Sequence, residues 1–510
     1  MIRHPSAGRM LLSAAFLAAL DLHAADPGPE DVTDFPSLEA HAQALARAAH
    51  VPVEQDLDSF FAKLNYDGHR RIRFREDKAL FGGAGDTFRV EFFHPGWMFK
   101  KPVRFHQITD EKAEPVGFDS GLFDYGGLEV PANAGHPAGY AGFRVLAPDS
   151  FLDRRFEFLV FMGASYYRAV TTELGYGISA RGIAVNTVGG APEEFPDFTR
   201  FWLARPKPGD DTFRLLALLD GPSLAGAYEF SAKPGRTTEM RVRGTLFLRQ
   251  KVEMLGIAPF SSMFWYGENS HPKPYDFRPE VHDSDGLQIE IENGPAIWRP
   301  LDVGRETRMS FFQAEKLKGF GLAGRDRDFA NFQDLEARYH QRPSVWVEPV
   351  AGFDKGAVVL VELPTGEETW DNIVAMWKPE SVPQTPDEAL RFEYKLLWHG
   401  GHEPGGLCKV AATRRGFVMD SDDHLYVLDF EPGMAERGKA ADWTPEARVR
   451  VNAGAAEVLD ARVMRNAESG GWRAFFKLDV PADTALLELI CELHDGPLVI
   501  SERWQYQWRR

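Results

Sequence analysis

Residues 358–377 (VVLVELPTGEETWDNIVAMW) constrain the fold more than any other stretch of the sequence. Two apolar runs, 358–363 and 372–377, enclose a short polar turn, so we expect two strands whose connection projects polar side chains. That turn holds Glu367, Glu368 and Asp371 together with Trp370. A carboxyl group beside an indole and other carboxylates has a raised pKa and can protonate a leaving oxygen at neutral pH. The alternative is a solvated acidic turn without chemistry.

The rest of the chain favours a mostly β fold. The 510 residues are 44% hydrophobic and include 47 Gly and 34 Pro, which suits a large core, many short strands joined by turns, and two or three domains. Residues 35–61 begin with helical spacing and predict a short helical lead-in. Alternating patterns such as residues 88–93 (FRVEFF) then predict strands.

Residues 378–388 (KPESVPQTPDE) are rich in proline and polar side chains and predict a linker. We therefore expect a large β-sandwich over residues 26–377 and a smaller immunoglobulin-like β-sandwich over residues 389–510. Cys408 and Cys491, the two cysteines of the chain, both fall in the second region. They could form one disulfide or remain two buried thiols, because their spacing alone does not place their Cα atoms.

Residues 1–25 have the pattern of a secretory signal peptide. Arg3 and Arg9 supply positive charge, residues 10–20 form an apolar run too short to span a bilayer, and small residues offer a cleavage site near Ala25. We therefore expect the mature protein in a periplasm. The formal net charge of -17 argues against a nucleic acid or an anionic membrane as partner.

Residues 275–287 (YDFRPEVHDSDGL) contain a second group of candidate site residues. Asp283 lies next to His282 and near Arg278, whose charges would favour its ionised form, as a general base requires. A turn in which Asp283 bonds its own backbone is an equally good interpretation. A calcium loop would need a carboxylate eleven residues after Asp283, where Gly294 stands. We expect no metal and no cofactor.

Aromatic residues offer flat faces that suit carbohydrate. Tyrosines occur between glycines in residues 161–168 (FMGASYYR) and 175–182 (GYGISARG), and neither stretch has the spacing of a nucleotide loop. Tyr339, Trp346 and Trp370 are candidates for one sugar-binding wall, although lone aromatics more often belong to a core.

Seven separated stretches, in order along the chain, resemble the periplasmic glucan biosynthesis proteins G and D of Gram-negative bacteria. They are GASYYR (163–168), SARG (179–182), EEFP (193–196), LGIAP (255–259), HDSDGL (282–287), RPS (342–344) and DNIV (371–374). The D type carries a twin-arginine signal that this sequence lacks, so the resemblance is closer to the G type.

The resemblance implies a large carbohydrate-enzyme-like β-sandwich, an immunoglobulin-like domain, and a role in osmoregulated periplasmic glucans with a β-1,2-linked backbone. It further implies an inverting glycoside hydrolase or transglycosylase with Asp371 as general acid and Asp283 as general base. Glu368 would tune Asp371, and His282, Arg278 and the three aromatics would contact glucan. In such a reaction the two carboxyl groups face each other across a cleft.

Relatives commonly carry an acid and an indole in the stretch that corresponds to residues 294–300, which here read GPAIWRP. This difference leaves open the length of the glucan and the choice between hydrolysis and transfer. A non-catalytic glucan-binding or scaffolding protein is the competing interpretation, and a mutarotase or epimerase is suggested by fold analogy alone. The expected partner is the β-1,2-glucan. An inner-membrane glucan synthase and a homo-oligomer remain open.

Overall fold

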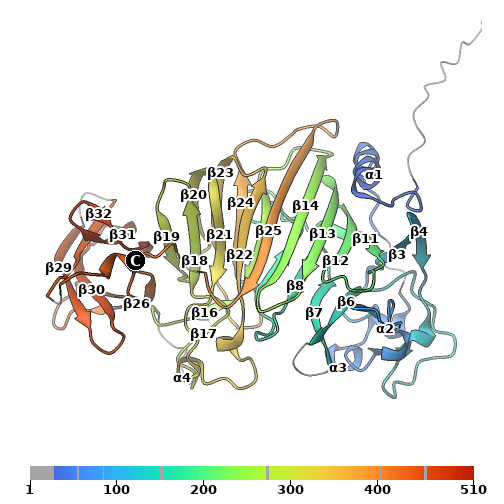
Figure 1. The fold of residues 1–510 in the computed structure, drawn as a ribbon, viewed down its shortest axis with the longest axis horizontal. Coiled ribbons are helices and arrows are strands. Elements are labelled where there is room, and N and C mark those ends of the chain that lie inside the picture. Colours follow the sequence, from blue (N-terminus) through green and yellow to red (C-terminus); the bar gives the residue numbers. More distant parts are fainter. Residues whose placement is uncertain are drawn as a thin grey trace, which may run out of the picture.

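The structure, a computed structural model, describes residues 28–53, 57–83, 85–149, 154–270, 275–402, 404–440, 442–452 and 456–510. The expected signal peptide lies outside the described residues. The described chain is mostly β, as predicted. Its N-terminal elements lie at one end of an elongated body and its C-terminal strands at the other (Figure 1).

One layer of the body is a 10-stranded sheet, counted over the described residues, which we call the first sheet. Its strands, in spatial order, are β2 (Arg89–Phe93), β6 (Gly142–Asp149), β7 (Arg154–Met162), β8 (Tyr166–Ala169), β9 (Ser179–Arg181), β15 (Leu255–Ser262), β24 (Ile373–Pro379), β23 (Lys355–Glu362) and β20 (Arg308–Glu315), with β10 (Ile183–Val185) beside β15.

The facing layer, the second sheet, has 15 strands in the part of the chain that the structure describes. Its order is β28 (Glu446–Val451), β31 (Leu486–Asp495), β33 (Arg503–Arg509), β19 (Ala296–Pro300), β18 (Gly286–Ile291), β21 (Leu317–Ala323), β22 (Ser344–Ala351), β25 (Ala389–His399), β14 (Thr238–Leu248), β13 (Leu224–Lys233), β12 (Phe213–Asp220), β11 (Asp197–Ala204), β3 (Arg104–Thr109) and β4 (Lys112–Val116), with β32 (Leu498–Val499) beside β31.

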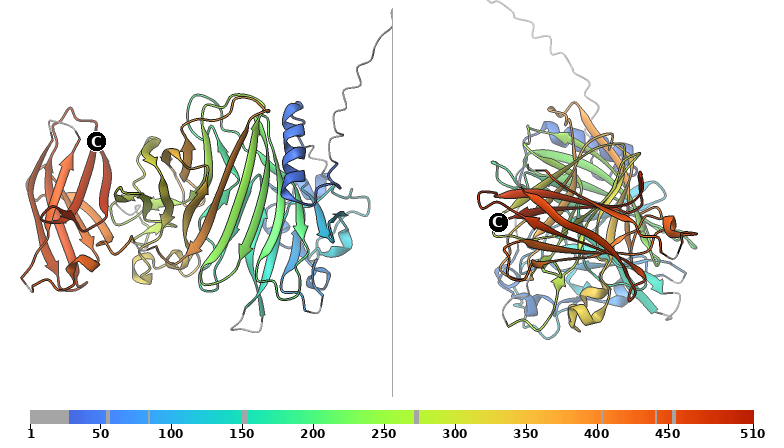
Figure 2. Two further views of the ribbon diagram at one scale, coloured as in Figure 1. Left: turned by 45° about the horizontal axis from the view of Figure 1, so that its top comes forward. Right: turned by 90° about the vertical axis from the view of Figure 1, so that its left-hand side faces the viewer.

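Apolar side chains from both sheets form the main core between them. Phe161 packs on Phe230 of the facing sheet with their ring centroids 5.2 Å apart, and Trp377 and Tyr394 are fully buried there. Helix α1 (Phe35–Arg47), the predicted lead-in, covers the other face of the second sheet over β12, β13 and β14 (Figure 2). The large unit is therefore a β-sandwich with one helix on its outer face.

Short elements complete the large unit. They are the helices α2 (Ser59–Ala62), α3 (Tyr66–His69) and α4 (Phe329–Phe332), the 3-10 turns at Glu76–Lys78, Ser120–Leu122 and Tyr339–Gln341, the strand pair β1 (Arg73–Phe74) and β5 (Phe123–Asp124), and the strand pair β16 (Phe264–Tyr266) and β17 (Val281–His282). A further 3-10 turn, Met434–Glu436, belongs to the C-terminal part of the chain.

The predicted boundary between the two sandwiches is wrong in one respect. Strand β25, which we expected to open the C-terminal domain, pairs with β14 and β22 in the middle of the second sheet. The proline-rich residues between β24 and β25 therefore connect the two sheets of the large sandwich. Proline and polar residues suit any exposed connection, so this pattern does not distinguish a sheet crossing from a domain linker.

The C-terminal sandwich begins after β25. Its own sheet contains β26 (Val410–Phe417), β27 (His424–Phe430), β30 (Gly471–Asp479) and β29 (Glu457–Asn466), and it packs against β28, β31 and β33. Cys408 and Cys491 are buried free thiols in that core. Strand β33 also pairs in parallel with β19, so the second sheet runs from the large sandwich into the C-terminal one (Figure 2).

Alternation along the strands of the first sheet determines which side chains reach solvent. Phe143, Tyr167 and Ala180 point into the core, while Arg144 and Arg168, each next to one of these residues in sequence, line a hollow on the outer face. The candidate site lies in that hollow.

Candidate functional site

Asp371 closes the connection between β23 and β24, and its neighbour Asn372 fixes it there. The Asn372 side chain accepts a hydrogen bond from the backbone N–H of Phe264 (2.9 Å) and donates to the carbonyls of Phe264 (2.9 Å) and Leu363 (3.0 Å). Its backbone N–H donates to the carbonyl of Ser262 (3.0 Å). Because Asn372 is buried, these bonds hold the backbone beside Asp371 tightly.

Asp283 is attached to the same short segment from the other side. Its backbone N–H donates to the carbonyl of Met263 at 2.8 Å, and the Ser284 hydroxyl lies 2.6 Å from that of Ser262. The segment 262–264 between β15 and β16 therefore bonds the neighbourhood of Asp371 and that of Asp283. Two carboxylates far apart in sequence are thereby brought together.

The charge of Asp283 reaches Asp371. Desolvation by the surrounding protein raises the pKa of Asp371, the Asp283 carboxylate adds to the increase, and Arg168 and Arg342 oppose it. Asp371 retains solvent exposure, and water weakens the effect of all these charges. The direction of the pKa shift favours a carboxyl group that still carries its proton when an ordinary Asp has lost it.

Asp283 is only 5% exposed and forms an ion pair with Arg342. Burial raises the pKa of Asp283, against the lowering effects of Arg342, Arg168 and His282. The Arg342 guanidinium lies over the Tyr339 ring, 4.4 Å from its centroid, and also donates to the carbonyl of Ala337 at 3.2 Å. Arg342 is thus held in place as it faces Asp283.

A hollow of about 680 Å³ extends from Asp371 over the outer face of the first sheet. Its walls combine aromatic, apolar and ionic side chains from β2, β6, β7, β8 and β9. The residues are Phe93, Met98, Phe99, Arg144, Glu157, Val160, Met162, Gly163, Ala164, Tyr166, Tyr167, Arg168, Tyr176, Ser179 and Asp371. This mixture suits an uncharged ligand that has both hydroxyl groups and apolar faces.

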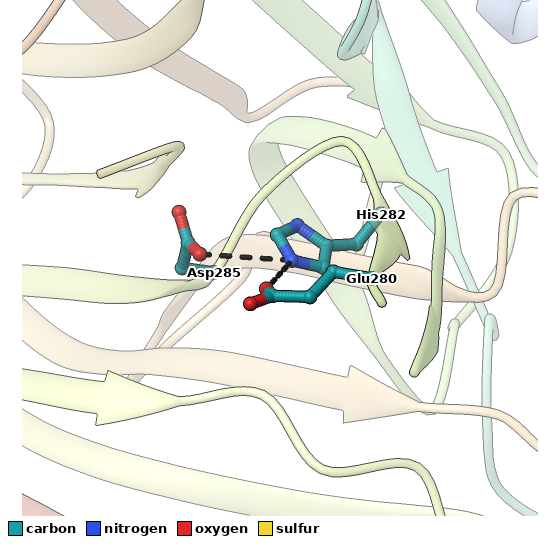
Figure 3. Close-up of side chains that lie close together, drawn as sticks. All are labelled: Glu280, His282 and Asp285. Atoms are coloured by element: carbon teal, nitrogen blue, oxygen red, sulfur yellow. Dashed lines mark hydrogen bonds and ion pairs between the residues drawn. The ribbon is translucent and has the colours of Figure 1, made fainter. Parts of the chain in front are cut away.

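His282 is a predicted glucan contact, but it is buried and does not line the hollow. It is 2% exposed, and its Nε2 faces Glu280 at 2.8 Å and Asp285 at 3.7 Å (Figure 3). Burial alone would lower the pKa of His282, but Asp285, Glu280 and Asp326 raise it to about 9. The ring is therefore a cation between two carboxylates at neutral pH.

Within the described residues, Glu280, His282 and Asp285 also form the set that could hold a metal ion, with ligand atoms within 4.8 Å of one another. In the structure the His282 Nε2 instead pairs with Glu280 and Asp285 directly. The ion-paired interpretation thus explains the cluster without a metal.

Arg278 and Glu368 stabilise the loops around Asp371. Arg278 pairs with Asp276 (2.8 Å), Asp334 (2.9 Å) and Glu368 (2.6 Å), so three carboxylates occupy its guanidinium. This pairing offsets part of the charge of Glu368, and Asp283 is the carboxylate that raises the pKa of Asp371. The expected tuning of Asp371 by Glu368 is therefore not what the structure shows.

The three predicted sugar-binding aromatics do not share one wall. Trp370 is 63% exposed beside Asp371, whereas Tyr339 is buried in a small core with Phe332 and Tyr266. Trp346 is buried in β22 and stacks on His402 with their centroids 4.1 Å apart. Gly319 on β21 leaves room for the Trp346 indole, and Gly321 lies against the backbone of Val345 and Trp346, so Trp346 packs on its own sheet.

Several residues of the hollow were not predicted individually. Tyr176 donates to Glu157, and Arg144 pairs with both Glu157 (2.7 Å) and Glu91. Arg168 donates to the Ser179 hydroxyl at 2.6 Å. In the sequence these residues are visible as polar side chains at alternate positions of otherwise apolar strands. This pattern identifies the outward face of the sheet but does not show that the face forms a hollow.

Residues 294–300, where the sequence departs from its relatives, are not among the residues that line the hollow. They include β19, which pairs with β33 at the junction of the two sandwiches. The expected effect of this stretch on the substrate cleft is therefore not supported by a contact between residues 294–300 and the hollow.

Comparison with known proteins gives a consistent result. Residues 33–508 match the family described as "Periplasmic glucan biosynthesis protein, MdoG". The chain is 42% identical over 497 residues to "Glucans biosynthesis protein D 1" of Ralstonia nicotianae, covering 92% of this chain and 90% of the relative. It is 39% identical to "Glucans biosynthesis protein D" of Xanthomonas campestris pv. campestris, with 97% and 96% covered.

A G-type relative is similar to almost the same extent. "Glucans biosynthesis protein G" of Pseudomonas paraeruginosa is 38% identical over 479 residues, or 91% of each chain. These identities do not separate the two types, so they give no support to the expected closeness to the G type. No helix within the described residues has the length and apolar character needed to cross a bilayer.

Proposed function

The chain belongs to the periplasmic glucan biosynthesis protein family, and we propose that it is an inverting glycoside hydrolase or transglycosylase acting on β-1,2-linked glucan in the periplasm. The observation that carries this proposal is the joint anchoring of Asp371 and Asp283 on residues 262–264, beside a long hollow with mixed apolar and polar walls.

Asp371 serves as the general acid in this proposal. It lines the hollow where a glycosidic oxygen could reach it, and its raised pKa favours the protonated form. Proton transfer from Asp371 to the leaving oxygen breaks the glycosidic bond as positive charge develops on the ring.

Asp283 serves as the general base. Its ion pair with Arg342 keeps a negative charge available, and its burial means that a water molecule or a sugar hydroxyl would carry the proton to it. Water attack on the opposite face of the sugar inverts the anomeric carbon, whereas attack by a sugar hydroxyl transfers the chain.

The decisive experiment is incubation of the purified protein with linear β-1,2-glucan, with products followed by size and by anomeric configuration in NMR. Shorter chains with an inverted anomer support hydrolysis, and longer chains support transfer. Products with a retained anomer would contradict the assignment of the pair.

A second candidate, a non-catalytic glucan-binding protein, is favoured by the ion pair between Asp283 and Arg342, because a paired carboxylate is a weaker base. The same incubation separates the two. Binding of the glucan with no change in chain length supports the second candidate.

A further inference from the structure

The outer face of the first sheet carries a second hollow, of about 570 Å³, next to the one at Asp371. Its walls are Glu76, Arg89, Glu91, Leu146, Pro148, Arg154 and Arg155. Along β2, Phe93 lines the first hollow while Glu91 and Arg89 line the second. These three residues alternate along one strand and therefore share one face of the sheet.

An ion-pair row separates the two hollows without isolating them. Arg144 of the first hollow pairs with Glu91 of the second, and also with Glu157 of the first. Glu91 is 2% exposed, so Arg144 neutralises its charge inside the row. A glucan chain bound in the first hollow could continue across this row of ion pairs into the second hollow.

Arg89 shares the second hollow with Glu76 and Glu91 but forms an ion pair with neither within the described part of the protein. No hydrogen bond or ion pair of its side chain occurs there, and its Nε is a buried donor without an acceptor. A half-buried guanidinium without an acceptor is unfavourable, because each donor removed from water normally finds a partner.

Arg155 brings a second positive charge to the same hollow. Its Nη2 donates to the carbonyl of Asp86 at 2.6 Å and its Nη1 to the carbonyl of Thr87. Backbone carbonyls fix the guanidinium, and the nearby Asp86 carboxylate offsets only part of its charge. Burial lowers the pKa of Arg155, and repulsion from Arg89 lowers it further. Two arginines that repel each other beside an open hollow suit an anionic ligand.

We propose that Arg89 and Arg155 form a binding site for an anionic group, a phosphate or a carboxylate, carried by the glucan that occupies the adjacent hollow. This inference rests on the proposed function for the identity of the carrier. The anion site itself depends only on the two arginines. On a chain with a formal net charge of -17, a positive hollow would select a charged substituent locally.

Arg89→Gln is the sharpest test, because it removes the charge and keeps a similar side-chain length. Arg155→Gln is less informative, since Arg155 also holds two backbone carbonyls. Lys316→Gln is the matched control. It makes the same change of charge at a side chain that is 75% exposed on the turn between β20 and β21.

The first arm titrates the wild type and both variants with inorganic phosphate, followed by 31P NMR line broadening and calorimetry. We expect binding to the wild type and to Lys316→Gln, and binding about tenfold weaker to Arg89→Gln, as loss of a charge-assisted contact predicts. Unchanged phosphate binding in Arg89→Gln, or none in the wild type, would overturn the anion site.

The second arm compares an unsubstituted β-1,2-linked oligosaccharide with one of equal length that bears a single phosphate monoester. We expect the wild type to prefer the charged oligosaccharide about tenfold and Arg89→Gln to lose that preference. Phosphate binding without any preference between the oligosaccharides would overturn the glucan as carrier. Failure of the unsubstituted oligosaccharide to bind at all would instead contradict the proposed function, and leaves the first arm intact.

Discussion

At the scale of single residues, the proposed chemistry depends on two carboxyl groups whose pKa values are both raised by burial. Arg342 sets a difference between them, because it is paired with Asp283 and acts on Asp371 only through space. A pair with one acidic and one basic member needs such an asymmetry.

Asp371→Asn should reduce the turnover of β-1,2-glucan by about 10²- to 10⁴-fold, because an amide has no transferable proton. The affinity for glucan should remain, since the amide keeps the shape of the side chain. Turnover numbers and calorimetric affinities measure the two effects. Asp387→Asn, at a 73% exposed side chain, is the control and should behave like the wild type.

The pH dependence should identify the two roles. The rate falls at high pH as Asp371 loses its proton and at low pH as Asp283 gains one. Arg342 lowers the pKa of Asp283, so Arg342→Met should raise that pKa and move the acidic limb to higher pH. Profiles of kcat/KM against pH give both limbs, and an acidic limb that stays in place would exclude Asp283 as the base.

Local patterns in the sequence flagged Asp371 and Asp283 separately, and only the family resemblance joined them as a proposed pair. No local pattern shows that Asn372 and Asp283 bond to the same residues 262–264, because that contact joins three distant segments. Trp346 illustrates the opposite problem. An aromatic residue at a strand position can face either side of a sheet, and the glycine that accommodates it, Gly319, lies on another strand.

At the scale of elements, the connection between β23 and β24 is anchored at its end by Asn372. The two strands were predictable from their apolar runs. They pair antiparallel, with Val361 opposite Val374 and Leu360 opposite Ala375, and this pairing brings the connection to the edge of the hollow. The buried amide of Asn372 then bonds three backbone groups. Rigid support of this kind keeps a catalytic group within the range that its chemistry tolerates.

Asn372→Ala should therefore reduce both stability and turnover. Loss of the side-chain hydrogen bonds leaves buried backbone groups unsatisfied and should cost about 2–4 kcal/mol of unfolding free energy. Chemical denaturation measures that cost, and turnover should fall about tenfold or more as Asp371 moves. Gln384→Ala, which removes one exposed contact, is the control. A variant with reduced stability but full turnover would contradict the positioning role.

At the scale of the whole molecule, the C-terminal sandwich contacts the segment that carries Asp283. Arg325 donates from its backbone N–H to Asp285, and its guanidinium pairs with Glu502 at 2.7 Å. Glu268, between β16 and the C-terminal sandwich, pairs with Arg414 at 3.0 Å and accepts from the backbone N–H of Thr413. The domain boundary could not be read from residues 378–388, because these contacts and the pairing of β25 are all long-range.

Glu268 should make this junction sensitive to pH. Burial raises the pKa of Glu268 to about 8, Arg414 and Thr413 oppose the change, and Glu280 and Asp285 add to it. The folded state therefore holds a proton that the unfolded chain releases near its ordinary pKa. The unfolding free energy should fall as pH rises from about 4.5 to about 8, and the loss is complete above that range.

Glu268→Gln removes this titration. Above pH 8 the variant should be more stable than the wild type by about 1–3 kcal/mol, a value reduced from the full pKa shift because solvent screens part of it. Thermal unfolding of both proteins across pH gives the difference directly. A constant difference between pH 4 and pH 9 would contradict the assigned titration.

The parallel pairing of β19 with β33 also bears on how the chain folds. Strand β19 has β18 on one side, and in the described part of the chain its other edge pairs with Arg503 and Trp504 of a strand much further along the sequence. Until that strand arrives, an unpaired edge is open to the wrong partner. Pairings between strands far apart in sequence slow folding. Because β33 covers the edge of β19, a protein that lacks β33 should aggregate instead of forming a stable shortened fold.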